Sequence, residues 1–175
     1  MPETTKSPIW SASEAIAATG GTARGLKRWS ASGVSIDSRE LAAGDLFIAL
    51  KGPNHDGHAF VRQALDNGAA AAIVEYVPDT FGDDAPLIIV EDSYKALADL
   101  GRAARERSGA HVIALTGSVG KTGTREMLVA AFAAQGLTHS SAKSHNNELG
   151  VALSLARMPP GADYAIFELG MNHPR

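Results

Sequence analysis

The stretch that decides the fold of this chain is Thr116-Gly117-Ser118-Val119-Gly120-Lys121-Thr122. An apolar run at residues 111–115 precedes it and predicts a buried strand, and residues 122–135 follow it with helical spacing. A strand, a glycine-containing loop and a helix, in this order, allow backbone N–H groups to cradle phosphate. We therefore predict a phosphate-binding loop, with Lys121 beside the β- and γ-phosphates of a nucleotide and the Thr122 hydroxyl on Mg²⁺.

This loop departs from the usual phosphate-binding pattern in one place. The first glycine of that pattern would fall at Leu115, whereas the glycine here is Gly117. A plain glycine-rich turn is one alternative, but it does not explain a Gly-Lys-Thr sequence at the start of a helix. A generic P-loop kinase or GTPase is another alternative, and it would have glycine at position 115.

Strands alternate with helices along the rest of the chain. Apolar runs predict strands at residues 34–36, 45–50, 70–74, 87–90, 137–140 and 165–167. Helical spacing predicts helices at residues 60–67, 94–107 and 147–158, and a short one between a capping box at Ser11 and a stop at Gly20. This alternation implies an α/β fold with parallel sheets.

The composition excludes several classes of protein. The 175 residues carry 16 Lys and Arg against 19 Asp and Glu, so the basic excess of a general nucleic-acid binder is missing. There is no cysteine, and the six histidines lack the spacing of a zinc site. No apolar run reaches the roughly 18 residues that span a bilayer, and the polar N-terminus lacks a signal-peptide core. We expect a soluble, cytoplasmic protein that neither binds nucleic acid nor inserts into a membrane.

Two further segments offer polar groups near the predicted phosphate-binding loop. Glu168 ends the strand at 165–167, and the carboxyl ends of parallel strands line ligand crevices, so its carboxylate is a candidate Mg²⁺ ligand. A solvated carboxylate at a strand end is the alternative. Asn146 and Asn147 stand just before a helix, where one of them is expected to be the N-cap and the other is free to bind substrate or phosphate.

The N-terminal half contains two polar loops, at residues 35–39 and 51–58, each after a predicted strand. Together they offer hydroxyls, a guanidinium and backbone N–H groups to a ligand. Taken alone they are ordinary loops. The residues that we select from them as candidate binding residues are Ser38, Arg39, Lys51, Gly52, Asp56, Gly57 and His58.

Together these segments resemble the Mur ligase family over nearly the whole chain after about residue 9. The similarity rests on the segments 36–39 (Ile-Asp-Ser-Arg), 44–52 (Gly-Asp-Leu-Phe-Ile-Ala-Leu-Lys-Gly), 56–58 (Asp-Gly-His), 116–122, 146–150 (Asn-Asn-Glu-Leu-Gly) and 168–173 (Glu-Leu-Gly-Met-Asn-His). The family's own loop has the form Thr-Gly-x-x-Gly-Lys-Thr, which explains the position of Gly117. The last two segments favour the members that add the dipeptide D-alanyl-D-alanine.

This resemblance implies an organisation in two domains. Residues 1–90 would form a small α/β domain that binds the UDP part of a substrate. Residues 91–175 would form the first part of a P-loop, parallel-sheet ATPase domain. The rest of that domain and a C-terminal domain would lie beyond Arg175, so these residues alone are not expected to complete a reaction.

The activity implied by the resemblance is ATP-dependent peptide-bond formation in peptidoglycan precursor synthesis, by a monomeric enzyme. The terminal carboxylate of UDP-N-acetylmuramoyl-tripeptide would become an acyl phosphate. The amine of D-alanyl-D-alanine would then displace the phosphate, with catalysis supplied mostly by positioning and charge stabilisation.

The resemblance also implies roles for individual residues. The seven candidates of the two N-terminal loops would face the uridine diphosphate. ATP would contact residues 116–123 together with Asn146 and Asn147. Lys121 and Glu168 would be catalytic, and Thr122 and Glu168 would hold Mg²⁺. Gly123 is a departure, since the family often has Thr or Ser there, and it lowers helix propensity slightly.

Two other functions remain open at this point. A family member that adds a single amino acid instead of a dipeptide is the nearest alternative. A UDP-sugar-binding module with an inactive P-loop is the second, although the complete Gly-Lys-Thr sequence and Glu168 argue against it.

Overall fold

The computed structural model describes residues 7–25, 28–52, 55–79, 81–141 and 147–170. The chain divides into two compact units, Met1–Asp99 and Leu100–Arg175. Among the helices of the described ranges, none is long and apolar enough to cross a membrane.

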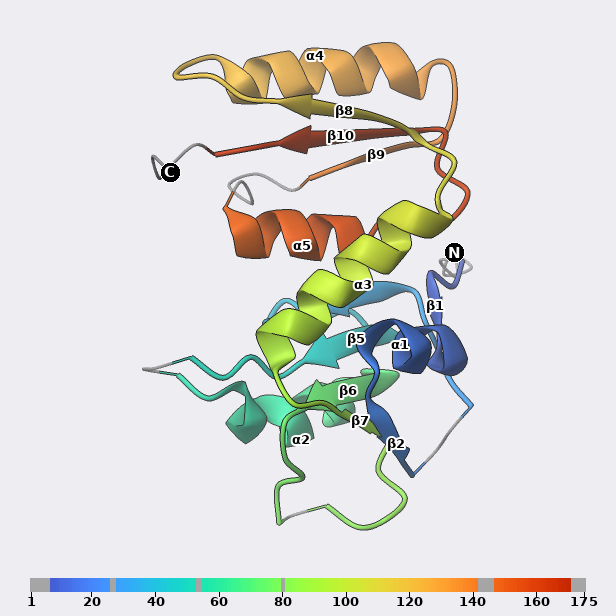
Figure 1. The fold of residues 1–175 in the computed structure, drawn as a ribbon, viewed down its shortest axis with the longest axis vertical. Coiled ribbons are helices and arrows are strands. Elements are labelled where there is room, and N and C mark those ends of the chain that lie inside the picture. Colours follow the sequence, from blue (N-terminus) through green and yellow to red (C-terminus); the bar gives the residue numbers. More distant parts are fainter. Residues whose placement is uncertain (1–6, 26–27, 53–54, 80, 142–146, 171–175) are drawn as a thin grey trace. The chain divides into compact units, whose positions relative to one another are not determined.

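The first unit is built on a five-stranded sheet (Figure 1). Its strands lie in the order β2 (Thr22–Arg24), β7 (Leu87–Ile89), β6 (Ala71–Val74), β5 (Asp45–Ile48) and β4 (Gly33–Ser35). The four strands β4 to β7 are parallel, and β2 runs antiparallel at the edge. A separate antiparallel pair joins β1 (Trp10–Ser11) to β3 (Ser30–Ala31).

Both faces of this sheet are buried, as parallel sheets require. On one face Phe47, Ala72 and Leu87 pack with Val61 and Ala64 of the neighbouring helix. The opposite face is equally buried, with exposed fractions of 0% at Leu46, Ile48, Ile73 and Ile88. The apolar runs in the sequence are explained by this double burial.

The helices of the first unit begin and end where local signals place them. Helix α1 (Ala12–Thr19) starts at a complete capping box between Ser11 and Glu14 and ends at Gly20, which is left-handed with φ 65°. A 3₁₀ turn, η1 (Gly57–Phe60), leads into α2 (Val61–Asp66). Helix α3 (Ser93–Arg107) begins in the first unit and continues into the second.

The second unit has a three-stranded, wholly parallel sheet with β10 (Tyr164–Glu168) between β8 (His111–Leu115) and β9 (Thr138–Ser140). Helix α4 (Lys121–Ala133) packs Phe132 on Tyr164, while α5 (Glu148–Ala156) contributes Leu155 to a cluster with Ala165 and Phe167. Because neighbouring strand residues point to opposite faces, α4 and α5 cover opposite faces of the sheet (Figure 1).

The structure confirms the α/β fold class with parallel sheets, and each predicted strand and helix is present within a few residues. It adds the strands β1, β2 and β3. These are two or three residues long and are defined by their hydrogen bonding to other strands. Helix α4 ends at Ala133, two residues before the predicted end at residue 135. Beyond it, a Cβ at Gly136 would lie 2.6 Å from the Asp163 carboxylate.

Candidate functional site

The second unit brings the candidate phosphate loop and Glu168 together at the carboxyl edge of its sheet. Strands β8 and β10 are parallel, and Leu115 is directly opposite Glu168. The loop at residues 116–120 therefore leaves the sheet beside the Glu168 carboxylate. The Thr116 hydroxyl adds a bond across this edge, since it donates to the Leu169 carbonyl at 3.0 Å.

The loop itself has the backbone expected of an anion-binding turn. Gly117 has φ 151° and Gly120 has φ 78°, and L side chains rarely adopt either value. Gly120 is the N-cap of α4, and no side chain caps this helix. Its first N–H groups are thus available to a ligand, and the loop is exposed, with Val119 at 89%.

The side chains that would contact phosphate and metal lie within the same small region. The Lys121 ammonium donates to the Gly117 carbonyl at 2.5 Å, so it folds back over the loop. The Thr122 hydroxyl donates to a Glu168 carboxylate oxygen at 3.3 Å, and Glu168 is 6% exposed. A hydroxyl and a carboxylate next to a phosphate loop are the oxygen ligands that Mg²⁺ prefers.

Protein side chains alone do not make a metal centre within the described residues, because no three His, Cys, Asp or Glu side chains gather there. Mg²⁺ commonly takes one or two protein oxygens and completes its shell with substrate phosphates and water. Thr122 and Glu168 fit that pattern.

A buried arginine, which the sequence did not single out, supports the third strand end of this edge. Arg125 of α4 is 5% exposed and donates from its guanidinium to the Ser141 carbonyl at 2.8 Å. The Ser141 hydroxyl accepts the backbone N–H of Glu168 at 3.3 Å. These bonds connect α4, the end of β9 and the metal-ligand candidate.

Of the two asparagines, Asn147 is the N-cap of α5, as expected for one member of the pair. Its side-chain oxygen accepts the Gly150 N–H at 2.8 Å. Asn146 lies outside the described residues.

The first unit has a pocket of about 380 Å³ at the carboxyl edge of its own sheet. The two polar loops predicted from the sequence meet there, because β4 and β5 are adjacent and parallel. The pocket is lined by Ile36, Asp37, Ser38, Arg39, Leu50, Gly52, His55, Gly57, Phe60 and Tyr94.

Ser38 and Arg39 line the pocket and are both held by neighbours. The Ser38 hydroxyl donates to the side-chain oxygen of Gln63 at 3.1 Å. Arg39 donates from Nε and from its backbone N–H to Asp37 Oδ1, both at 2.9 Å. These bonds, the side-chain one above all, lower the pKa of Asp37 to about 2 and raise the pKa of Arg39. The Arg39 guanidinium is therefore paired with the ionised Asp37 carboxylate, and both groups line the pocket.

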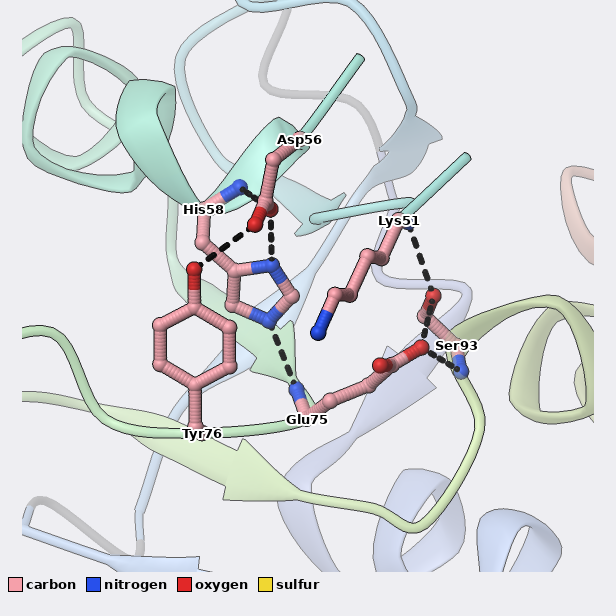
Figure 2. A network of polar contacts seen from close by, with 6 residues as sticks. All are labelled: Lys51, Asp56, His58, Glu75, Tyr76 and Ser93. Carbon is pink, nitrogen blue, oxygen red and sulfur yellow. Dashed lines mark hydrogen bonds and ion pairs between the residues drawn. The ribbon is translucent and has the colours of Figure 1, made fainter. Parts of the chain in front are cut away.

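Gly52 and Gly57 also line the pocket, but Lys51, Asp56 and His58 do not. These three belong to a polar network with Glu75, Tyr76 and Ser93 (Figure 2). The Asp56 carboxylate accepts the His58 N–H at 2.9 Å and the Tyr76 hydroxyl at 2.7 Å. Burial acts to raise the pKa of Asp56, but these hydrogen bonds outweigh it and lower the pKa to about 2. The same contact raises the pKa of Tyr76.

The tautomer of His58 follows from its two partners. The His58 side chain is 1% exposed, and its Nε2 lies 2.8 Å from the Glu75 backbone N–H, which can only donate. Nε2 is therefore the acceptor, and Nδ1 carries the proton that is donated to Asp56 Oδ1 at 2.5 Å. The ring also stacks on Tyr76, with centroids 4.1 Å apart. Both nitrogens of His58 are thus used inside the protein.

The remaining part of this network holds the start of α3. One oxygen of Glu75 accepts the Ser93 backbone N–H at 3.0 Å and the Ser93 hydroxyl at 2.8 Å. The Ser93 hydroxyl in turn accepts the Lys51 N–H at 3.3 Å. The Lys51 ammonium lies 5.3 Å from the centre of the Tyr76 ring.

Sequence reasoning missed Gln63, Glu75, Tyr76 and Tyr94 at this site. Glu75 and Tyr76 directly follow β6, so the strand-end rule that selected the two loops also applies to them. Gln63 lies on α2 and Tyr94 on α3. No local signal marks these two, since their positions depend on how helices pack at the sheet edge.

Comparison with known families matches most of the chain to one family. The Mur ligase family catalytic domain matches residues 30–105. The Mur ligase middle domain matches residues 115–175. The first match lies mostly in the first unit and extends to residue 105, and the second lies wholly in the second unit and begins at the end of β8.

Relatives in several bacteria are similar over four fifths of the chain. The UDP-N-acetylmuramoyl-tripeptide–D-alanyl-D-alanine ligase of Rickettsia prowazekii (strain Madrid E) is 44% identical over 140 residues, which are 80% of this chain and 31% of that protein. The ligase of the same name from Escherichia coli (strain K12) is 43% identical, over 80% of this chain and 30% of that protein. The chain thus spans about a third of the length of these relatives.

Solved structures show the same similarity in three dimensions. A UDP-N-acetylmuramoylalanyl-D-glutamyl-2,6-diaminopimelate–D-alanyl-D-alanyl ligase from Acinetobacter baumannii has a TM-score of 0.83 and 37% identity, covering 98% of this chain and 38% of that one. MurF ligase from Thermotoga maritima in complex with ADP has a TM-score of 0.64 and 32% identity, covering 81% of this chain and 33% of that one. With both units matched in sequence and in structure, the chain belongs to the Mur ligase family.

Proposed function

We propose that this chain is part of an ATP-dependent ligase that joins D-alanyl-D-alanine to UDP-N-acetylmuramoyl-tripeptide in peptidoglycan precursor synthesis. Its relatives that are 43–44% identical carry that name. The observation that carries the proposal is the meeting of the phosphate loop with the Thr122–Glu168 contact. A module with a degenerate loop would have no need to keep a hydroxyl, a carboxylate and a lysine together.

The second unit is proposed to hold the nucleotide. A related MurF structure contains ADP. In this chain the N–H groups of residues 117–123 would surround the β- and γ-phosphates, and the Lys121 ammonium would move from the Gly117 carbonyl onto them. Thr122 and Glu168 would hold Mg²⁺, which supplies charge neutralisation on the phosphoryl oxygens. Asn147 contributes by setting the start of α5, and Asn146 is proposed beside the nucleotide.

The pocket of the first unit is proposed to bind the uridine diphosphate part of the substrate. Its walls combine the Arg39 guanidinium and the Ser38 hydroxyl with the aromatic side chains of Phe60 and Tyr94. A charged group for phosphate and apolar surface for a base suit a nucleotide. We assign this role to residues 1–90 and the ATP role to residues 91–175.

In the parent enzyme the tripeptide carboxylate would be phosphorylated by ATP, and the amine of the dipeptide would displace phosphate from the acyl phosphate. Lys121 would offset charge on the transferred phosphoryl group, and Arg39 would hold the remote end of the substrate in place. We place this reaction in the cytoplasm, in a monomeric enzyme.

Calorimetric titration of the chain with UDP-N-acetylmuramoyl-tripeptide, and separately with Mg·ATP, tests this proposal. Arg39→Ala should weaken binding of the UDP compound at least tenfold and leave binding of Mg·ATP unchanged. Lys121→Ala should weaken binding of Mg·ATP at least tenfold and leave binding of the UDP compound unchanged. Asp79→Asn, on an exposed side chain, is the control for both. Binding of Mg·ATP with no binding of the UDP compound would favour a generic P-loop protein instead.

A further inference from the structure

The described residues of the segment after β5 form one wall of the first unit's pocket, and backbone hydrogen bonds join them to one another. The Gly52 N–H donates to the His55 carbonyl at 2.8 Å, and the Gly57 N–H donates to the Leu50 carbonyl at 2.8 Å. An isolated antiparallel bridge joins Lys51 to Asp56. Gly57 is packed so closely that a Cβ there would lie 2.8 Å from Leu50 N and O. Three residues of this loop, Gly52, His55 and Gly57, face the pocket.

The side chains behind this wall attach the loop to the neighbouring strand. Asp56 is bonded through Oδ1 to His58 and through Oδ2 to Tyr76. His58 is bonded in turn to the Glu75 backbone. Glu75 and Tyr76 follow β6, so the end of β5 is joined to the end of β6 by side chains rather than by the sheet alone (Figure 2).

The hydrogen bonds of this attachment fix the orientation of side chains, which filling the buried space would not require. An apolar side chain at position 58 could fill the same buried space without any hydrogen bond. His58 instead donates to a carboxylate with one nitrogen and accepts from a backbone N–H with the other, which fixes the rotation of its ring. Since both oxygens of Asp56 are also engaged, the carboxylate plane beside Gly57 is fixed as well.

We propose that Asp56, His58 and Tyr76 are positioning residues that hold Gly52, His55 and Gly57 in the conformation that binds the uridine diphosphate group. None of the three lines the pocket, so they act through Gly52, His55 and Gly57. Holding a loop in its bound conformation before the ligand arrives lowers the entropy lost on binding. This inference rests on the proposed function, because it takes the pocket to be the UDP site.

Three variants of the full 175-residue chain separate the contacts. Tyr76→Phe removes one hydroxyl from Asp56 and keeps the stacked ring. His58→Gln retains an acceptor that can reach the Glu75 N–H and loses the donor to Asp56, whereas His58→Asn does the opposite. Tyr164→Phe, in the second unit, is the matched control for loss of a tyrosine hydroxyl.

The dissociation constant for UDP is then measured by calorimetry at a temperature where every variant is folded. We expect Tyr76→Phe and both His58 variants to raise the dissociation constant about three- to tenfold, and Tyr164→Phe to leave it unchanged. A purely structural role would lower the unfolding midpoint and leave the dissociation constant of the folded protein as it was, and that result would overturn the inference.

Nitrogen-15 spectra of the histidine rings supply a second readout that does not depend on ligand. The unmodified chain and Tyr76→Phe should show His58 protonated at Nδ1 and unprotonated at Nε2. The opposite tautomer would overturn the inference. If the unmodified chain does not bind UDP, both the proposed function and this inference are refuted. If all variants bind UDP with the same dissociation constant as the unmodified chain, only the inference is refuted.

Discussion

Asp37 and Asp56 illustrate how single residues obtain similar properties from different neighbours. The pKa of Asp37 falls to about 2 through hydrogen bonds from the side chain and backbone of Arg39, two residues away. Burial pushes the pKa of Asp56 upward, but the His58 backbone and the Tyr76 hydroxyl, which is 20 residues away, lower it to about 2. The first interaction is local in sequence, and the second depends on the pairing of β5 with β6.

The low pKa of Asp56 predicts how stability responds to acid. Its pKa is about 2 when folded, against 3.8 for an ordinary Asp, so the folded state favours the carboxylate. The stability that it contributes is present above pH 3.8 and is lost as the pH falls through about 2. In urea titrations the free energy of unfolding should drop less steeply between pH 4 and pH 2 for Asp56→Asn than for the unmodified chain.

The control for this experiment is Asp79→Asn, which removes an exposed carboxylate outside the network. Its acid profile should follow that of the unmodified chain. Equal slopes for all three proteins would mean that the network does not stabilise the ionised form of Asp56.

At the scale of secondary-structure elements, the sequence predicted the N-terminal caps of two helices. The capping box of α1 joins residues three apart, and the cap of α5 joins Asn147 to Gly150. The C-terminal end of α4 was predicted less accurately. The helix stops at Ala133, two residues before its predicted end, and the Gln135 and Gly136 N–H groups both donate to the Phe132 carbonyl, at 2.8 and 3.1 Å.

The Asn147 cap predicts a measurable effect on α5. Asn147→Ala leaves the Gly150 N–H without its acceptor and should lower the free energy of unfolding by about 1 kcal/mol. Asn147→Asp keeps an acceptor and adds a negative charge at the helix N-terminus, so its stability should be close to that of the unmodified chain. Chemical denaturation followed by circular dichroism measures both. Equal losses in the two variants would show that the cap is not what residue 147 contributes.

Across the whole molecule, the two units use the same arrangement twice. In each, polar residues gather where adjacent parallel strands end: around the pocket after β4 and β5, and around the phosphate loop after β8 and β10. This placement follows from parallel topology, since all carboxyl ends meet at one edge.

The outer edge of β8 predicts the behaviour of the chain in solution. Among the described strands only β10 pairs with β8, and Val112 on this edge is 36% exposed. Open edges with apolar side chains favour pairing between molecules. We expect sedimentation to show self-association that grows with concentration, and Val112→Lys to reduce it. Sedimentation as a single species at all concentrations would contradict this expectation.

The sequence by itself determined the features that depend on neighbours in the chain: the phosphate loop with its glycines, the helix caps, the buried strands and the α/β alternation. A turn, a cap or an amphipathic period involves residues within a few positions of each other, so it is visible without the fold. Ser38 and Arg39 were selected because they follow a predicted strand, Glu168 because it ends one, and Thr122 because it belongs to the loop pattern.

Tertiary structure alone decided which of these residues line the pocket. Lys51, Asp56 and His58 come from the same loop as Gly52 and Gly57, yet they do not line the pocket and bond instead with Glu75, Tyr76 and Ser93. Likewise, Arg125 reaches Ser141 and Ser38 reaches Gln63 only after helices have packed on the sheets. Such contacts join residues 16 to 42 positions apart, and strand register and helix packing set them, which a local pattern does not encode.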